Sequence, residues 1–267
     1  MLNTLQFRGA TCYYREEGKG KNIMLVHGFV EEGSMWDELV KSLKKTHRVI
    51  VPDLPGFGKS GLPADGSKLS INLYAEFIAT LATKAKLKKF VLLGHSMGGY
   101  AALYFAEKHP DQLRGFGLVN SHCYADTPEK KEGRKKSIAH IKQYGTKVFV
   151  NELYHTLFHP AFLKKNKTFV NGLVKKAQGY SPEALMQATA AMMNRENKEE
   201  VLKQLNTPVL FIQGKDDLAA PIANTLKQAS LPSIADIHIF SNARHMSVFE
   251  RKAETIAIVK DYLGRLK

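Results

Sequence analysis

Residues 90–100 carry the feature that most constrains this chain. They read Phe-Val-Leu-Leu-Gly-His-Ser-Met-Gly-Gly-Tyr, an apolar run followed by Gly-x-Ser-x-Gly and then by a helical pattern that Pro110 must end. Such a run predicts a strand buried on both faces, and Ser96 then lies at a strand-to-helix turn. Gly94 and Gly98 lack a Cβ atom, so the backbone can turn sharply and lift the serine hydroxyl clear of the sheet. The pattern predicts a nucleophilic serine.

Strand and helix patterns alternate on both sides of this turn. The alternation predicts an α/β fold class, with a mostly parallel, doubly wound sheet and helices on both of its faces. Strands are predicted at residues 5–7, 11–15, 23–27, 49–51, 90–93, 116–119, 209–212 and 237–240. Helices are predicted at residues 34–45 with Ser34 as the cap, from Ser70 onward, at 222–229, and at 249–263 after a capping box of Ser247 and Glu250.

Residues 121–204 interrupt the alternation with a pattern that is helical only. Thr127-Pro128 and Ser181-Pro182 each read as a helix cap followed by proline at the first helical position. This segment holds more aromatic residues and methionines than helices lying on solvent need. We expect most of them to form a small core and about a third of them to face a pocket.

Composition favours a water-soluble protein without a nucleic-acid partner. The net charge is +14, but the lysines are scattered along the chain and no nucleic-acid-binding motif accompanies them. Residues 1–10 hold no apolar segment typical of a signal peptide, and no apolar run reaches the roughly 20 residues that span a bilayer. Cys12 and Cys123 form no disulfide framework. We therefore expect a cytoplasmic protein of undetermined oligomeric state.

A serine nucleophile needs a base, and the base needs a carboxylate partner. His245 is the best candidate base because it lies between the last predicted strand and the last predicted helix. We expect His27 to shape its loop and His95 to pack beside the site. Asp216 and Asp217 both follow the strand at residues 209–212, and either could be the acid.

Further motifs accompany Ser96, and together they resemble the α/β-hydrolase family over nearly the whole chain. These are Leu25-Val26-His27-Gly28-Phe29, the loop Asp53 to Ser60, Gly214 to Pro221, and Arg244-His245-Met246. The resemblance implies an α/β-hydrolase core at residues 1–120 and 205–267, with residues 121–204 inserted as an α-helical lid.

The resemblance also implies the roles of individual residues. The family's spacing to Gly214 and Pro221 selects Asp217 over Asp216, so the implied catalytic triad is Ser96, His245 and Asp217. The implied oxyanion hole consists of the backbone N–H groups of Met97 and Phe29. The expected function is hydrolysis of a small-to-medium carboxylic ester through an acyl-enzyme, with a small-molecule ester substrate and with no cofactor and no metal.

Two alternatives remain open from the sequence. The same triad serves relatives with other chemistry, namely C–C bond hydrolases, enol-lactonases, perhydrolases and enzymes of elimination reactions. A receptor that closes its lid on a small molecule is a further possibility on the same fold.

Overall fold

The computed structural model describes residues 2–266, and its centre is one sheet of eight strands. The spatial order is β1-β2-β4-β3-β5-β6-β7-β8. The first two strands pair antiparallel with each other and β2 pairs antiparallel with β4, whereas all later neighbours are parallel. This confirms the predicted mostly parallel sheet. The strands are Leu2–Phe7 (β1), Ala10–Glu17 (β2), Lys21–Val26 (β3), His47–Pro52 (β4), Phe90–His95 (β5), Leu113–Val119 (β6), Val209–Gly214 (β7) and Ala235–Phe240 (β8).

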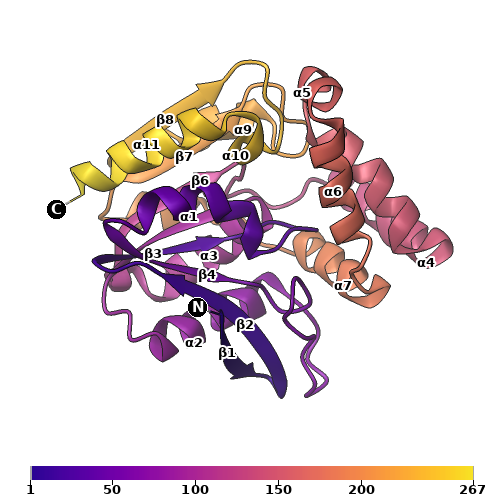
Figure 1. Cartoon of the computed structure of the whole chain (residues 1–267), viewed down its shortest axis with the longest axis horizontal. Helices are drawn as coiled ribbons and strands as arrows, with labels where there is room; N and C mark the ends of the chain where they lie inside the picture. The colour runs from indigo at the N-terminus through magenta and orange to yellow at the C-terminus, as the bar shows by residue number, and fades with distance from the viewer. Residues whose placement is uncertain (1, 267) are drawn as a thin grey trace.

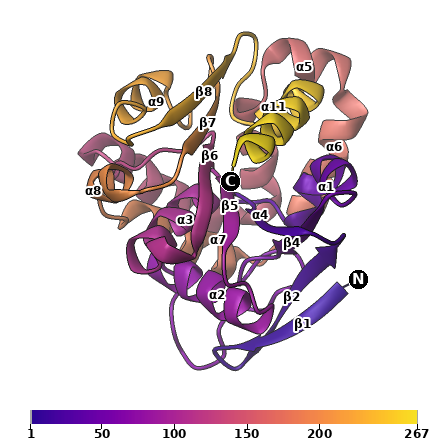
Figure 2. The ribbon, with the colours of Figure 1, turned by 90° about the vertical axis from the view of Figure 1, so that its left-hand side faces the viewer.

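Helices cover both faces of this sheet (Figure 2). On one face, α1 (Asp37–Leu43) and α11 (Lys252–Arg265) enclose a core that includes Trp36 and Tyr262. On the other face, α2 (Ile71–Lys84) and α3 (Met97–Lys108) pack against the sheet. Every residue of β5 is buried, as expected for a central strand with apolar layers on both sides. The shorter elements are the 3-10 helices at Gly33–Trp36 and Pro110–Gln112, α9 (Ile222–Gln228) and α10 (Ser247–Glu250).

Five helices separate β6 from β7, and Figure 1 shows α4 to α7 gathered beyond one end of the sheet. Thr127 and Ser181 cap α4 and α7 through their hydroxyl oxygens, as predicted. This arrangement supports the proposal that residues 121–204 form a lid on the core. No helix within residues 2–266 combines the length and the apolar character that crossing a membrane requires. The five are Pro128–Leu157 (α4), Pro160–Lys165 (α5), Lys167–Ala177 (α6), Pro182–Met193 (α7) and Glu199–Gln204 (α8).

Helix α4 is broken at Gly145, which has φ +78° and ψ 174°. Such a positive φ is easily adopted only by glycine, so the helix changes direction there. The two halves contact each other, since His140 Nε2 lies 3.2 Å from Glu152 Oε2. One helix can therefore supply two walls of the same pocket.

Two of the predicted helix caps are wrong. The predicted helix at residues 34–45 is a 3-10 turn followed by α1, whose N-cap is Trp36, and the Ser34 hydroxyl donates to Glu32 instead. The predicted capping box at Ser247 also fails, because α10 and α11 are separate and Met246 is the N-cap of α10.

Tertiary contacts explain the missing capping box. The hydroxyl of Ser247 donates to Asn120 Oδ1. The carboxylate of Glu250 accepts from the backbone N–H of His159 at 2.6 Å and of Arg244 at 2.9 Å. Asn120 and His159 are distant in sequence, whereas Arg244 lies six residues before Glu250, and all three compete with the local cap.

Candidate active site

Ser96 lies at the sharp turn between β5 and α3. Its backbone has φ +49° and ψ −116°, a strained conformation that the surrounding structure must hold. Its N–H donates to Val119 O at 3.0 Å, which ties the turn to the neighbouring strand β6. A Cβ atom on Gly98 would lie 2.4 Å from His27 O, so only glycine allows this close approach. The turn thus has the geometry that the Gly-x-Ser-x-Gly pattern predicts.

The structure brings Ser96, His245 and Asp217 into one hydrogen-bonded chain. His245 Nε2 lies 2.8 Å from Ser96 Oγ, and His245 Nδ1 lies 2.8 Å from Asp217 Oδ2. The carboxylate can only accept, so Nδ1 carries the proton and Nε2 is free to accept the serine proton. All three residues are buried. The arrangement can activate a serine hydroxyl as a nucleophile.

Asp217 is held as a carboxylate by its neighbours. Burial alone would raise its pKa, but the electrostatic interaction with His245 and several hydrogen bonds outweigh burial and hold the pKa below its usual value. The other donors are the backbone N–H groups of Ala219 and Ala220, at 2.8 and 2.9 Å, and the side-chain amides of Asn120 and Gln213, at 2.9 and 3.1 Å.

Asp216, the alternative acid, points elsewhere. Its side chain is 45% exposed, and its carboxylate lies 3.9 Å from the ring nitrogen Nε2 of His159. It makes no contact with His245 in the described part of the chain. Of the two adjacent carboxylates, the structure therefore places Asp217 against the histidine.

Sequence reasoning missed the residues that position Asp217. Asn120 Nδ2 donates to Asp217 and also to Arg244 O at 3.0 Å, so it joins the acid to the loop of the histidine. The amide of Gln213 is itself held by Thr225 Oγ1 at 2.9 Å. The available signal was that Asn120 and Gln213 lie at the carboxyl ends of adjacent parallel strands, where sites in α/β sheets form.

Two further histidines pack near the site, as expected. Burial lowers the pKa of His95 to about 3, so its ring stays neutral, and its Nε2 lies 2.9 Å from His245 O. His27 Nε2 accepts from the backbone N–H of Leu54 at 2.8 Å, which shapes the loop after β4. Neither is hydrogen-bonded to Ser96 in the described structure, so His245 is the histidine in position to act as base.

The backbone near Ser96 offers hydrogen-bond donors for an oxyanion. Met97 is the first residue of α3, and an N–H in the first turn of a helix has no acceptor within the helix. Phe29 lies in the loop after β3 and lines the same pocket as Ser96. These positions support the proposal that Met97 and Phe29 form the oxyanion hole.

Ser96 and His245 open into a pocket of about 340 Å³. The second half of α4 and α7 give it an apolar wall that includes Phe149, Leu153 and Met192. The first half of α4 gives it a wall with Lys130 and Arg134. Of the aromatic residues and methionines of the lid, only Phe149 and Met192 line this pocket, fewer than the third expected.

A buried carboxyl joins the lid to the loop after β3. Glu31 is 4% exposed, and Tyr154 of α4 donates to its Oε1 at 2.7 Å. Tyr180 donates to its backbone carbonyl at 3.1 Å. Burial raises the pKa of the Glu31 carboxyl to about 8, although the hydrogen bond from Tyr154 opposes part of the shift. Glu31 is therefore protonated at neutral pH.

This carboxyl predicts a pH-dependent stability. Between its ordinary pKa of 4.5 and about 8, the folded protein keeps a proton that the unfolded chain has released, so the free energy of unfolding falls as pH rises. Glu31→Gln has no proton to lose. The measurement is the free energy of unfolding in urea. From about pH 5 to about pH 9, this free energy should rise by up to about 4 kcal/mol in the variant relative to wild type.

The matched control for this measurement is Glu132→Gln on the exposed side of α4. It should differ from wild type by less than about 0.5 kcal/mol at either pH. Equal pH dependence in wild type and Glu31→Gln would show that Glu31 does not hold this proton.

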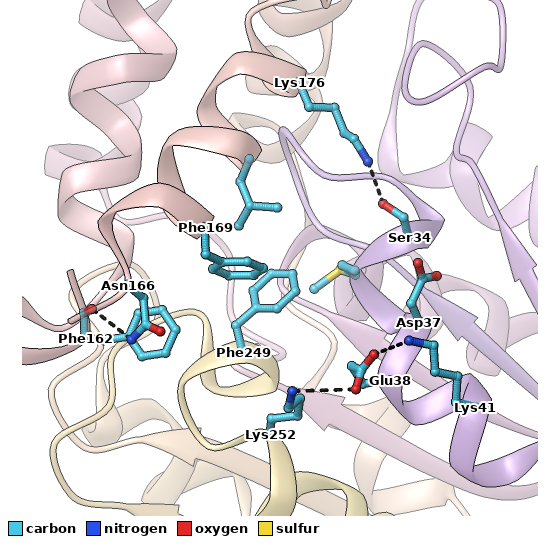
Figure 3. A pocket seen from close by; sticks show the side chains of 12 residues that line it. Ser34, Asp37, Glu38, Lys41, Phe162, Asn166, Phe169, Lys176, Phe249 and Lys252 are labelled. Carbon is cyan, nitrogen blue, oxygen red and sulfur yellow. Dashed lines mark hydrogen bonds and ion pairs between the residues drawn. The ribbon is translucent and has the colours of Figure 1, made fainter. Parts of the chain in front are cut away.

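A second pocket, of about 520 Å³, lies between the lid and α1 (Figure 3). Phe162, Phe169 and Phe249 line it, and charged residues surround them. Glu38 pairs with Lys41 and Lys252, so these charges are compensated. This pocket is larger than the one at Ser96, but none of the candidate catalytic residues lines it. We therefore take the smaller pocket as the active site.

This chain is similar to known proteins in sequence and in fold. A family model described as alpha/beta hydrolase fold matches residues 21–252. A proline iminopeptidase of Lactobacillus acidophilus is 27% identical over 97% of this chain and 96% of that enzyme. A 2-hydroxymuconate semialdehyde hydrolase of Pseudomonas sp. is 23% identical over 96% of this chain and 91% of that enzyme. The solved structure of a thermophilic esterase from Thermogutta terrifontis superposes with a TM-score of 0.90, at 26% identity, over 96% of this chain and 94% of that chain. This chain belongs to the α/β-hydrolase family, and it is an enzyme.

Proposed function

We propose that this enzyme is a serine hydrolase that cleaves small-to-medium carboxylic esters. The observation that carries the proposal is the hydrogen-bonded chain from Ser96 Oγ through His245 to Asp217, at the edge of a pocket. The pocket volume of about 340 Å³ lies near the lower end of the range for small-molecule sites. It suits a compact ester.

In the proposed mechanism, Ser96 Oγ attacks the ester carbonyl carbon while His245 Nε2 takes its proton. Asp217 keeps the histidine in the required tautomer and stabilises the imidazolium. The tetrahedral intermediate then expels the alcohol, which receives the proton from His245, and an ester of Ser96 remains. Water attacks this acyl-enzyme with His245 again as the base, and the free carboxylic acid leaves.

The negative charge on the carbonyl oxygen needs donors in both steps. The proposed donors are the backbone N–H groups of Met97 and Phe29. Each donor of this kind contributes about 10²–10³ in rate in a serine hydrolase. Because backbone groups are held by the fold, they need no reorganisation during the reaction.

The charge of the pocket argues for an ester over an aminopeptidase substrate. A substrate with a free amino terminus carries a cation that needs an anionic partner. Lys130 and Arg134 are basic side chains that line the pocket, and no carboxylate lines it within residues 2–266. We therefore place ester cleavage ahead of peptide cleavage.

C–C bond hydrolysis is the second candidate, because one relative is a 2-hydroxymuconate semialdehyde hydrolase. The same serine and histidine serve in that proposal. The two functions differ in the bond that breaks, so substrate turnover separates them.

The test is a panel of p-nitrophenyl esters of increasing acyl length, with wild type and Ser96→Ala. We expect wild-type turnover that falls once the acyl chain exceeds the pocket, and almost none in the variant. A fluorophosphonate probe should label Ser96 alone. Labelling of Ser96 without turnover of any ester would favour C–C hydrolysis, and neither labelling nor turnover would favour a receptor.

A further inference from the structure

We infer that the preferred substrates of this enzyme carry a carboxylate on the acyl chain, which Lys130 and Arg134 bind. This inference rests on the proposed ester hydrolysis and names the substrate class. The observation behind it is that two cationic side chains line the pocket of Ser96, whereas no carboxylate within residues 2–266 lines it.

Helix α4 presents these side chains on one face. Lys130, Gly133, Arg134 and Ser137 all line the pocket, at the spacing that places residues on the same side of a helix. Gly133 carries no side chain, and a Cβ atom there would meet no atom within 4 Å apart from its neighbours in the helix, so no other element fills the space beside it. A ligand group can enter this space.

The charges in this wall do not cancel. Asp126 is buried and pairs with both Arg134, at 2.5 Å, and Arg195, at 2.7 Å. Arg195 also lies over the ring of Tyr100, another lining residue, at 4.1 Å from its centre. Lys130 adds a third cation that is not paired with Asp126, so this part of the lid holds three cationic side chains and one buried carboxylate.

Lys130 has no acidic partner in the described chain. Its Nζ donates to the backbone carbonyl of Ala219 at 2.5 Å, which leaves two of its three N–H donors available. Ala219 N–H donates to Asp217, so the ammonium lies beside the loop of the proposed catalytic acid. A half-buried ammonium without a counter-ion strongly favours binding of an anion.

The apolar wall of the pocket restricts where the anion can lie. Phe149, Leu153, Leu157 and Met192 line it, and they offer no partner for a charge. The combination favours an apolar chain between an ester near Ser96 and a carboxylate near Lys130. Hemiesters of dicarboxylic acids have this chemistry.

The test compares kcat/KM for monomethyl esters of glutaric, adipic and pimelic acid with that for neutral methyl esters of equal chain length. For the best length, wild type should prefer the anionic ester by about 10–100-fold. Lys130→Gln should lower this ratio about tenfold, and Lys130→Arg should restore most of it. Lys131→Gln, which removes a charge from the exposed side of the same helix, should leave the ratio at the wild-type value.

The ratio separates binding from a structural role. If Lys130 only fastened the lid to Ala219, its loss would change both substrates equally and leave the ratio unchanged, which would overturn the inference. Equal turnover of anionic and neutral esters by wild type would overturn it too, while the proposed ester hydrolysis would stand. Turnover of neither class, or turnover that survives Ser96→Ala, would instead contradict the proposed function.

Discussion

Ser96→Ala is expected to lower kcat on any ester substrate by about 10⁴–10⁶-fold, with the fold intact. The alanine cannot form the acyl-enzyme, and the positive φ of residue 96 is imposed by its surroundings and not by the hydroxyl. The measurement is single-turnover and steady-state kinetics on the best ester of the panel. A circular-dichroism melt within a few degrees of wild type would show that the loss is chemical.

Two further variants serve as a comparison and a control for Ser96→Ala. His245→Ala should lose activity to a similar extent, since no other base among residues 2–266 is hydrogen-bonded to Ser96 Oγ. Ser230→Ala, at an exposed serine after α9, should stay within about twofold of wild type. If Ser96→Ala kept more than about a tenth of the activity, Ser96 would not be the nucleophile.

Asp217→Asn is expected to lower kcat by about 10⁴-fold, with little change in KM. The amide cannot hold the His245 proton on Nδ1 as a carboxylate does, so the ring is free to adopt the tautomer that cannot accept from Ser96. The new amide nitrogen, itself a donor, would also lie against donors, because all the hydrogen bonds of the Asp217 carboxylate within residues 2–266 are accepted by it. The measurement is kcat and KM on the same ester.

The adjacent residue provides the matched control. Asp216→Asn makes the same chemical change on an exposed side chain whose carboxylate lies 3.9 Å from His159 Nε2. It should remain within about tenfold of wild type, because exposed ion pairs contribute little. Greater loss in Asp216→Asn than in Asp217→Asn would reverse the assignment of the acid and leave the serine hydrolase proposal standing.

Local patterns in the sequence were enough to predict the strands and helices of the α/β core. The predicted strands and helices of the core lie at nearly the same residues in the structure. Each element buries one face or both, so its apolar residues recur at a regular spacing that can be seen in a short stretch of sequence. The turn at Ser96 was predictable for the same reason, since its strand, glycines and helix lie within a dozen residues. The local caps at Thr127 and Ser181 were predictable too.

Local patterns failed where a distant partner competes. Ser247 and Glu250 have the spacing of a capping box, yet Asn120, His159 and Arg244 take their hydrogen bonds. The spacing of Ser247 and Glu250 does not reveal these partners, because Asn120 and His159 lie on distant segments that only folding brings close. Arg244 is near in sequence, but its hydrogen bond to Glu250 depends on the conformation of the loop before α10.

The sequence by itself determined the α/β core, the turn at Ser96 and the order in which a serine, an acid and a histidine follow one another. The residues alone left two neighbouring carboxylates open, and the family resemblance selected Asp217. Only the tertiary structure decided that Asp217 lies against His245 and that Asn120 and Gln213 hold it there. It also decided that Lys130 faces the pocket, since this depends on where α4 lies relative to the sheet. The physical reason is that the spacing of apolar residues specifies which face of a helix or strand is buried. The residues that this face contacts belong to elements distant in sequence, so they are set by the packing of the whole fold.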